Sequence, residues 1–225
     1  MSIDLDDITA VILAGGKGRR MGGQDKGLIE FDAKPLAAIL VDRLSEQGVK
    51  IVINANRNQD RYQQFGHPVI SDKLEDYQGP LAGFASAMAA VDSKFILTLP
   101  CDGPLLSDDY VARFIASYRA RETPIQVAFD GERLQPVHAM INVDLLPSLN
   151  QFLDSGDRKI DRWYAQHDYA RVDFSDCANM FRNINTPADR DSLQTVSCSA
   201  PYPYSVSAPT AALARPPCCA RLFPH

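Results

Sequence analysis

Short apolar runs alternate with amphipathic stretches along the first part of the chain. The apolar runs predict strands at Thr9–Leu13, Val49–Asn54, Pro68–Ile70, Phe95–Leu99 and Ile125–Phe129. The stretches between them carry apolar residues at helical spacing, and they predict helices at about Pro35–Glu46, Gln59–Phe65, Leu81–Ala90 and Ser107–Arg119. Strands that alternate with helices are typical of a parallel sheet with helices on both faces.

Residues at the expected helix ends agree with this pattern. Pro35 suits a first helical position, and Gly48 follows the last turn of that helix. Ser107 is the expected N-cap of a later helix, with Asp108 and Asp109 in its first turn.

After Gly131 the pattern becomes less regular. Pro136–Asn142 and Ala170–Phe174 predict further strands, and Asp144–Leu153 predicts a helix. Thr186–Pro187 has the residue types of a cap and a first position of a final helix. We therefore expect one α/β domain whose sheet is mixed but mostly parallel.

The last part of the chain, residues 195–225, differs in composition from the rest. It holds six of the fifteen prolines and three of the five cysteines, and it contains no Asp, Glu or Gly. A segment without apolar periodicity cannot offset its ordering entropy by burial. We expect a folded domain at residues 1–194 and a disordered tail at 195–225. The alternative is a docking tail that uses its PYPY or ARPP segment as a polyproline ligand.

Composition excludes several classes of protein. The chain has 225 residues, of which 45% are hydrophobic and 23% charged, which is ordinary for a soluble domain. No apolar stretch approaches the roughly 20 residues of a membrane span. The acidic start, MSIDLDDI, is unlike a signal peptide. We expect a cytoplasmic protein with reduced thiols, and a net charge of −5 disfavours nucleic acid and anionic membranes as partners.

A glycine-rich segment, LAGGKGRRMGGQDKGL, follows the first predicted strand at Leu13–Leu28. Six of the thirteen glycines lie in it, with four cations and one anion. Glycine lets several backbone N–H groups approach one ligand, and cations beside them neutralise phosphates. The segment therefore predicts a site for a diphosphate or triphosphate, and a solvated loop with incidental charges is the alternative.

Two common phosphate-binding motifs do not fit this segment. Gly18 and Gly23 have the P-loop spacing, but Gln24 stands where that motif requires Lys. Met21 stands where the dinucleotide fingerprint requires its third Gly. A GTPase of the P-loop type is therefore disfavoured.

Asp102 follows the predicted strand Phe95–Leu99 almost directly. Ligands of open α/β sheets bind at the carboxyl ends of the strands, and a carboxylate is a suitable ligand for Mg²⁺. The alternative is a helix-capping aspartate.

Five segments, in their order along the chain, together resemble one family. They are LAGG with RMG and DKG (Leu13–Gly27), INAN (Ile53–Asn56), ISDKLEDYQGPLAG (Ile70–Gly83), PCDGP (Pro100–Pro104) and NINTP (Asn183–Pro187). They are similar to those of the molybdenum cofactor guanylyltransferase (MobA) family of Rossmann-like nucleotidyltransferases. The resemblance spans about Ile8–Leu193.

The resemblance implies a reaction and its participants. Such an enzyme transfers GMP from GTP to molybdopterin, forms molybdenum guanine dinucleotide and releases pyrophosphate, with Mg²⁺ as cofactor. Its candidate protein partners are a molybdenum-insertion protein, apo-molybdoenzymes and their chaperones. A single Rossmann-like nucleotidyltransferase domain acting as a monomer is then expected.

Site residues follow from the matching motifs. Lys26 and Arg20 are expected to hold the β- and γ-phosphates, and Asp102 to bind the metal; these three residues are the catalytic candidates. The GTP-binding set implied is Leu13, Ala14, Gly15, Gly16, Lys26, Asn54, Asp72 and Asp102. The pterin side is expected at Gly83, Asn183 and Asn185.

Within this set, Asn54 is expected to read the guanine base, because an amide offers both donors and acceptors. By resemblance, Asp72 contacts the ribose or the surroundings of the metal. Structural roles remain open for Asn54 as a strand-end turn residue, for Asp72 in an Asx-turn, for Gly83 in helix packing, and for Asn183 beside a helix cap.

Two other functions remain open at this point. A nucleotidyltransferase of the same fold could use CTP on the same pterin, or load a sugar phosphate. A non-catalytic module could bind GTP and deliver the cofactor without releasing pyrophosphate.

Overall fold

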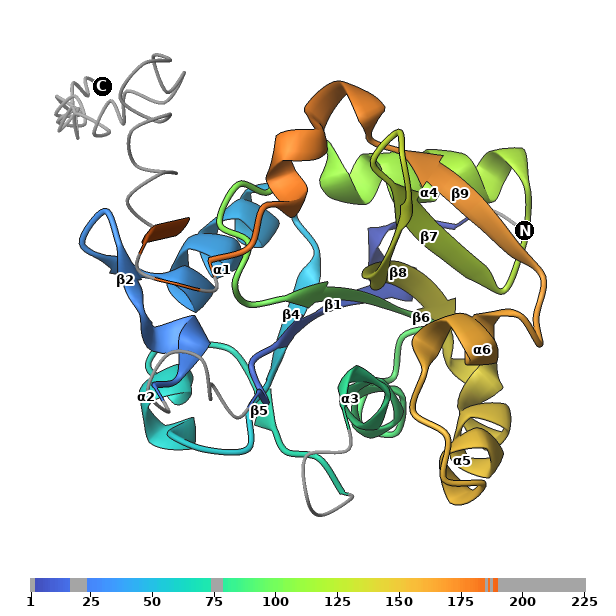
Figure 1. Ribbon diagram of the computed structural model, residues 1–225, viewed down its shortest axis with the longest axis horizontal. Helices are drawn as coiled ribbons and strands as arrows, with labels where there is room; N and C mark the ends of the chain where they lie inside the picture. The colour runs from blue at the N-terminus through green and yellow to red at the C-terminus, as the bar shows by residue number, and fades with distance from the viewer. Residues whose placement is uncertain (1–2, 17–23, 74–78, 185, 187, 190–225) are drawn as a thin grey trace, which may run out of the picture.

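The computed structural model describes residues 3–16, 24–73, 79–184, 186 and 188–189. Within these residues, seven strands form one mixed sheet (Figure 1). In spatial order they are β5 (Val69–Ile70), β4 (Lys50–Asn54), β1 (Ile8–Leu13), β6 (Phe95–Pro100), β8 (Leu134–Asn142), β7 (Ile125–Phe129) and β9 (Tyr169–Asp173). The helices are α1 (Leu36–Glu46), α2 (Gln59–Gln63), α3 (Pro80–Met88), α4 (Tyr110–Ala120), α5 (Leu146–Asp154) and α6 (Ile160–Tyr164).

Six of the seven strands in this described sheet run in the same direction. β5, β4, β1 and β6 pair in parallel, and β9 pairs in parallel with β7. β8 is antiparallel to both of its neighbours, β6 and β7. The expected mixed, mostly parallel sheet is confirmed.

Helices cover both faces of the sheet, as the sequence pattern predicts (Figure 1). On one face, Ile12 of β1 packs in a core with Leu40 of α1 and Phe114 of α4. On the other face, the neighbouring Val11 joins a core with α3, α5 and α6. Successive residues of a strand point to opposite faces, so the uninterrupted apolar run of β1 is what a sheet buried on both faces requires.

The chain crosses the sheet in two directions from β1. β4 lies on one side of β1 and β6 on the other. α1, which follows β1, and α3, which precedes β6, lie on opposite faces. A sheet of this kind has a crevice where the strand order reverses, at the carboxyl end of the central strand, and this crevice is the usual place for a ligand.

One helix begins later than its sequence predicts. The expected N-cap, Ser107, lies before a turn in which Tyr110 N donates to the carbonyl of Ser107. α4 begins at Tyr110 with Asp109 at the N-cap, and no side chain caps it. The Ser107 hydroxyl donates to the Asp109 carboxylate instead, so the two side chains satisfy each other.

Several short elements are absent from the predicted pattern. A hairpin of β2 (Glu30–Phe31) and β3 (Lys34–Pro35) precedes α1, and its turn places Asp32 and Ala33 at positive φ. α6 is a five-residue helix. Short 3-10 helices lie at η1 (Leu5–Asp7), η3 (Lys26–Leu28), η4 (Val143–Leu145) and η5 (Ser175–Phe181).

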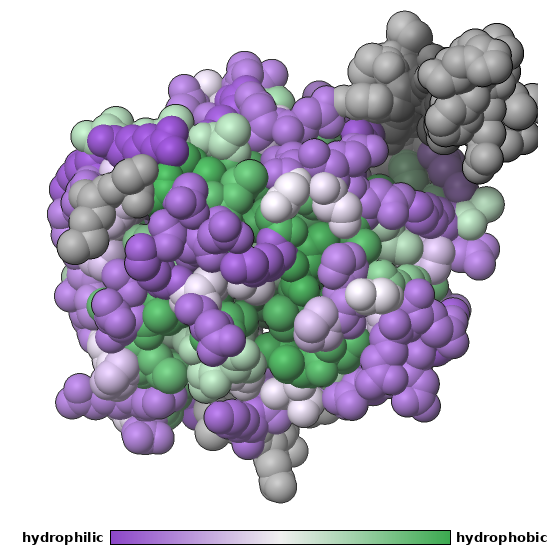
Figure 2. Space-filling view, turned by 180° about the vertical axis from the view of Figure 1, so that it is seen from behind, coloured by the Kyte–Doolittle hydropathy of each residue, from purple (hydrophilic) through white to green (hydrophobic). Residues whose placement is uncertain are grey.

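The described surface is mainly polar. In Figure 2, hydrophilic side chains cover much of the face seen from behind, with apolar residues visible between them. Among the described residues, Leu5 is the large hydrophobic residue whose side chain is exposed. The helices of this part of the chain are too short or too polar for any of them to cross a membrane. Cys101 and Cys177 carry free thiols.

Candidate active site

The carboxyl ends of three adjacent strands form the floor of the site. Leu13, the last residue of β1, pairs with Asn54 of β4 and with Pro100 of β6. Two further backbone bonds extend these ladders, since Ala14 N donates to Asn54 O at 2.8 Å and Cys101 N donates to Leu13 O at 3.2 Å. The predicted nucleotide-binding residues Leu13, Ala14 and Asn54 therefore lie side by side.

Asp72 organises the amides at the end of β4. The Asn54 amide donates from Nδ2 to Asp72 Oδ1 at 2.9 Å, and Asn56 Nδ2 donates to Asp72 Oδ2 at 2.7 Å. Asn56 Oδ1 accepts from the Asp72 backbone N–H at 2.8 Å. The Asn54 NH₂ group donates to Asp72, and the Asn54 Oδ1 atom lies beside Gly83.

Two glycines leave room around that oxygen. A Cβ on Gly83 of α3 would lie 2.9 Å from Asn54 Oδ1 and 2.8 Å from Leu13 Cδ2. A Cβ on Gly15 would lie 2.9 Å from Asn56 Nδ2 and 3.5 Å from Asn54 Oδ1. At both positions the backbone comes close to an asparagine side chain, and glycine allows this approach. We call Asn54, Asn56, Asp72, Gly15 and Gly83 the Asn54 group.

Lys26 and Asp102 come together on the other side of the same strand ends. Lys26 Nζ donates to Asp102 Oδ2 at 2.8 Å, and both side chains are largely buried, with 23% and 11% of their surface exposed. Lys26 lies in η3, within the glycine-rich segment, and Asp102 lies two residues beyond β6. Two of the three predicted catalytic residues are thus in direct contact.

The other carboxylate oxygen of Asp102 fits a metal ligand. Asp102 Oδ1 is buried and has no hydrogen-bond partner within the described part of the protein. An unsatisfied buried carboxylate oxygen is costly, and a hard cation such as Mg²⁺ is a partner that would satisfy it. The described residues contain no group of three or more His, Cys, Asp or Glu side chains placed to hold a metal. Substrate phosphates and water would therefore supply the remaining ligands.

Asn183 lies close to Asp102. Ile184 N donates to the Asp102 carbonyl at 2.8 Å, and a Cβ on Gly103 would lie 3.3 Å from Asn183 Oδ1. Asn183 is thus beside the metal-ligand candidate, while Gly83 lies beside Asn54. Thr186 and Asp189 exchange the two bonds of a capping box, which supports the interpretation of Thr186 as a helix cap.

Cys101 has no nucleophilic role in this arrangement. It is buried between β6 and Asp102. Burial raises the pKa of the Cys101 thiol far above its usual value, and the neighbouring Asp102 carboxylate adds to the rise. The thiol is therefore neutral at physiological pH, and a thiol rather than a thiolate is a poor nucleophile.

The structure does not describe every predicted site residue, and one residue of the site was not predicted. Arg20 and Asn185 lie outside the described residues, while Gly16 is described and meets nothing within 4 Å of an added Cβ. Asn56 belongs to the INAN segment but had no predicted role. The alternation of polar and apolar residues in that segment was the available signal, because it places Asn54 and Asn56 on the same side of the chain.

A glycine-rich sequence that follows the central strand, at the switch point of a mixed α/β sheet, is typical of nucleotide-binding enzymes. Comparison with known proteins narrows this class. A family model described as the MobA-like NTP transferase domain matches residues 10–172. The chain belongs to this family of nucleotidyltransferases.

Individual relatives agree with this assignment. The chain is 49% identical over 186 residues to a protein of Shewanella halifaxensis named molybdenum cofactor guanylyltransferase, a match that covers 83% of this chain and 93% of the relative. A protein of Shewanella sediminis with the same name is 49% identical over 193 residues, covering 86% of this chain and 97% of the relative.

Solved structures share the fold. Molybdopterin-guanine dinucleotide biosynthesis protein A of Archaeoglobus fulgidus superposes with a TM-score of 0.70 at 19% identity, covering 85% of this chain and 98% of that one. A Mycobacterium tuberculosis protein solved as a complex with manganese superposes with a TM-score of 0.60 at 16% identity, covering 83% and 97% of the two chains. These likenesses place the sheet and its helices in a known architecture.

Proposed function

We propose that this protein transfers GMP from GTP to molybdopterin, forming molybdenum guanine dinucleotide and releasing pyrophosphate. The observation that carries the proposal is the placement of the Asn54 amide at the end of β4 and of the Lys26–Asp102 pair at the end of β6, on either side of β1. The chain is also nearly half identical to proteins named for this reaction.

The base end of GTP is assigned to the Asn54 group. Asp72 fixes the Asn54 amide with its oxygen beside Gly15 and Gly83. An amide oxygen is a suitable acceptor for the N–H groups on the Watson–Crick edge of guanine. Leu13, Ala14 and Gly15 supply the backbone edge against which the ring would lie. Gly16 begins the segment expected to follow the phosphates.

The phosphate end is assigned to Lys26 and Asp102, with Arg20 as a second cation. Lys26 provides a buried positive charge that can offset charge on the leaving pyrophosphate. Asp102 would hold Mg²⁺ through Oδ1. When bound there, Mg²⁺ supplies charge neutralisation at the phosphates.

The proposed transfer needs no protein nucleophile. A terminal phosphate oxygen of molybdopterin forms a bond to the α-phosphorus of GTP, and the bond from that phosphorus to the β-bridging oxygen breaks. The bonding electrons leave with pyrophosphate. The contribution of the chain is to align the two substrates and to offset their charge. Asn183, beside Asp102, is assigned to the pterin side together with Asn185. Gly83, beside Asn54, gives room at the base end of the nucleotide.

We also propose that the enzyme acts as a monomer in the cytoplasm and hands its product to apo-molybdoenzymes or their chaperones. Few large apolar side chains are exposed in the described part of the chain, which supports a monomer.

The test is pyrophosphate release from molybdopterin and Mg²⁺ supplied with GTP, CTP or ATP in parallel. Release with GTP alone is expected. Release with CTP alone would keep the site but overturn the assigned base. Binding of GTP without release by any nucleotide would instead favour a cofactor-delivery module.

A further inference from the structure

We infer that Arg57 is a positioning residue of the nucleotide site, which holds together the backbone on either side of residues 17–23, the central part of the glycine-rich segment. Arg57 Nη2 donates to the Gly16 carbonyl at 3.2 Å and to the Gln24 carbonyl at 2.9 Å. These two carbonyls stand at either end of residues 17–23, the stretch that carries Arg20. One guanidinium nitrogen therefore joins backbone groups that are eight residues apart in the sequence.

Arg57 is itself well placed to act as a fixed anchor. It follows β4 by three residues and precedes Asn58, the N-cap of α2, which has a left-handed backbone with φ of 51°. Its side chain is 27% exposed. The backbone that carries it is therefore attached directly to the sheet, close to Asn54 and Asn56.

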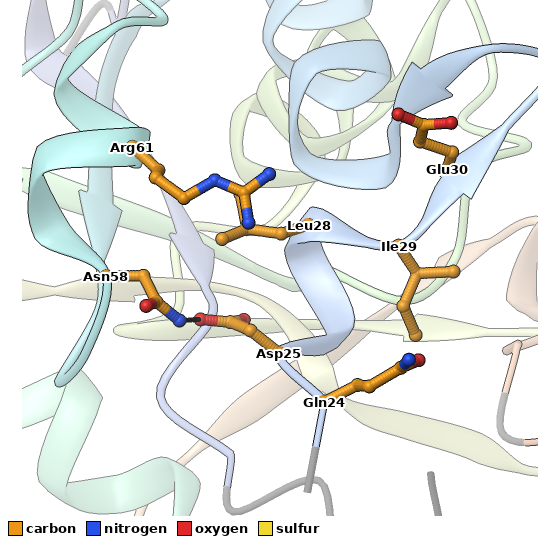
Figure 3. A pocket seen from close by; sticks show the side chains of 7 residues that line it. All are labelled: Gln24, Asp25, Leu28, Ile29, Glu30, Asn58 and Arg61. Atoms are coloured by element: carbon orange, nitrogen blue, oxygen red, sulfur yellow. Dashed lines mark hydrogen bonds between the residues drawn. The ribbon is translucent and has the colours of Figure 1, made fainter. Parts of the chain in front are cut away.

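The same corner of the protein holds Asp25, the residue before Lys26. Asp25 is 8% exposed, and its carboxylate accepts from Tyr62 Oη at 2.5 Å and from Asn58 Nδ2 at 2.9 Å. Figure 3 shows the Asn58 amide directed at Asp25. Both side chains line a pocket of about 550 Å³. Arg57 Nε lies 3.6 Å from Asp25 Oδ2 as an ion pair. Arg57, Asn58 and Tyr62 therefore all contact Asp25, which follows residues 17–23 in the chain.

The next two residues, Lys26 and Gly27, are also held in place by contacts. Gly27 packs so closely on Tyr62 that an added Cβ would lie 2.5 Å from the hydroxyl oxygen. The backbone of Lys26 is therefore fixed by its neighbours Asp25 and Gly27. Its ammonium group donates to Asp102 at 2.8 Å. A chain segment whose two ends are joined has less conformational entropy for ligand binding to remove. Arg57 would therefore act on nucleotide binding without touching the nucleotide.

The first test does not depend on catalysis. Lys17, Arg19 and Arg20 provide trypsin cleavage sites between the two carbonyls that Arg57 joins. We compare Arg57→Ala with Arg61→Ala, a matched change of an exposed arginine one turn further along α2. Cleavage at these three sites, located by mass spectrometry, should be about fivefold faster in Arg57→Ala than in Arg61→Ala and the wild type. Equal rates in both variants would overturn the inference.

The second test rests on the proposed function and separates positioning from folding. Interactions made equally in the ground and transition states change KM and leave kcat nearly constant. Arg57→Ala should raise KM for GTP about tenfold with kcat within about threefold of the wild type. Arg57→Lys, which keeps a cation beside Asp25, should recover part of the loss. Loss of kcat with an unchanged KM would contradict a positioning role.

The two tests fail independently. If the wild type transfers no nucleotide at all, the proposed function is wrong, but the cleavage comparison still decides whether Arg57 holds the segment. If Arg57→Ala is too unstable to assay, Arg57→Lys and Arg57→Gln are carried through both measurements, with Arg61→Lys and Arg61→Gln as their controls. Failure of every Arg57 variant to differ from its Arg61 counterpart rejects the inference.

Discussion

Lys26 donates a 2.8 Å hydrogen bond to Asp102 across 76 residues of sequence. The two residues come from different loops, one after β1 and one after β6, and they meet because those strands are neighbours in the sheet. Lys26 is expected to contact phosphate, and Asp102 is expected to contact a metal. Their side chains are hydrogen-bonded to each other. Each keeps the charge of the other compensated in a largely buried place.

Asp102→Ala should abolish nucleotidyl transfer. The substitution removes the carboxylate oxygen that is buried without a partner, and it leaves Lys26 without this acceptor. Metal-dependent charge stabilisation is large, so we expect a loss of about 10³-fold or more in kcat, measured as pyrophosphate release at saturating Mg²⁺. Asp102→Asn should not restore it, because a neutral amide is a weak ligand for a hard cation. Wild-type turnover in either variant would show that this carboxylate is not the metal ligand.

Lys26→Ala should weaken GTP binding and slow transfer together. The lost charge would act on phosphates in both the ground state and the transition state. We expect KM for GTP to rise about tenfold and kcat to fall about tenfold or more, from steady-state rates. Lys26→Arg keeps the charge but not the compact ammonium group, so partial activity is expected. An unchanged KM in Lys26→Ala would remove this residue from the nucleotide site.

The adjacent glycines Gly15 and Gly16 should respond differently to alanine. A Cβ on Gly15 would lie 2.9 Å from Asn56 Nδ2, so the amide must move away from Asp72. We expect Gly15→Ala to lower the free energy of unfolding by about 1–2 kcal/mol. A Cβ on Gly16 meets nothing within 4 Å, so Gly16→Ala should change it by less than about 0.5 kcal/mol. Urea denaturation measures both, and equal effects would contradict the described packing.

His138 should make the protein less stable in mild acid. Burial lowers the pKa of His138 to about 3, while an unfolded histidine titrates near 6.5. Between these values the unfolded chain binds a proton that the folded chain does not, so the free energy of unfolding falls as pH falls. From pH 7 to pH 5 the contribution is about 2 kcal/mol.

The matched variant is His138→Gln, which removes the titration beside Tyr110, whose hydroxyl lies 3.1 Å from His138 Nδ1. Urea denaturation of both proteins at pH 7 and pH 5 gives the comparison. The variant should lose less stability over this range than the wild type. Identical losses would show that His138 takes up a proton in the folded state.

Periodicity predicted most of the strands and helices, including the short β5 and α2. β1, β4, β6 and α1 follow from apolar runs and spacing, because burial on both faces of a sheet leaves a strong pattern. The turn of the β2–β3 hairpin was not predictable, since Asp32 and Ala33 adopt positive φ without glycine. The antiparallel direction of β8 also leaves no mark in its own sequence, since an apolar strand reads alike in either direction.

The sequence indicated the residues of the proposed site but not their contacts. The family resemblance pointed to Lys26, Asn54, Asp72 and Asp102, of which Asp72 and Asp102 each follow a predicted strand. It did not show that Asp72 orients Asn54 or that Lys26 pairs with Asp102, because both contacts join segments far apart in the chain. Arg57 was missed for the same reason, since an arginine before a short helix carries no sign of the carbonyls that it will reach.

The most direct test of the proposed reaction is to follow each phosphate of GTP. GTP labelled at the α-phosphate, or in a second reaction at the γ-phosphate, is incubated with molybdopterin, Mg²⁺ and either the wild type or Asp102→Ala. The α-label should appear in the pterin dinucleotide and the γ-label in pyrophosphate, with the wild type only. Release of the γ-label as inorganic phosphate, with no α-label in the pterin product, would contradict guanylyl transfer.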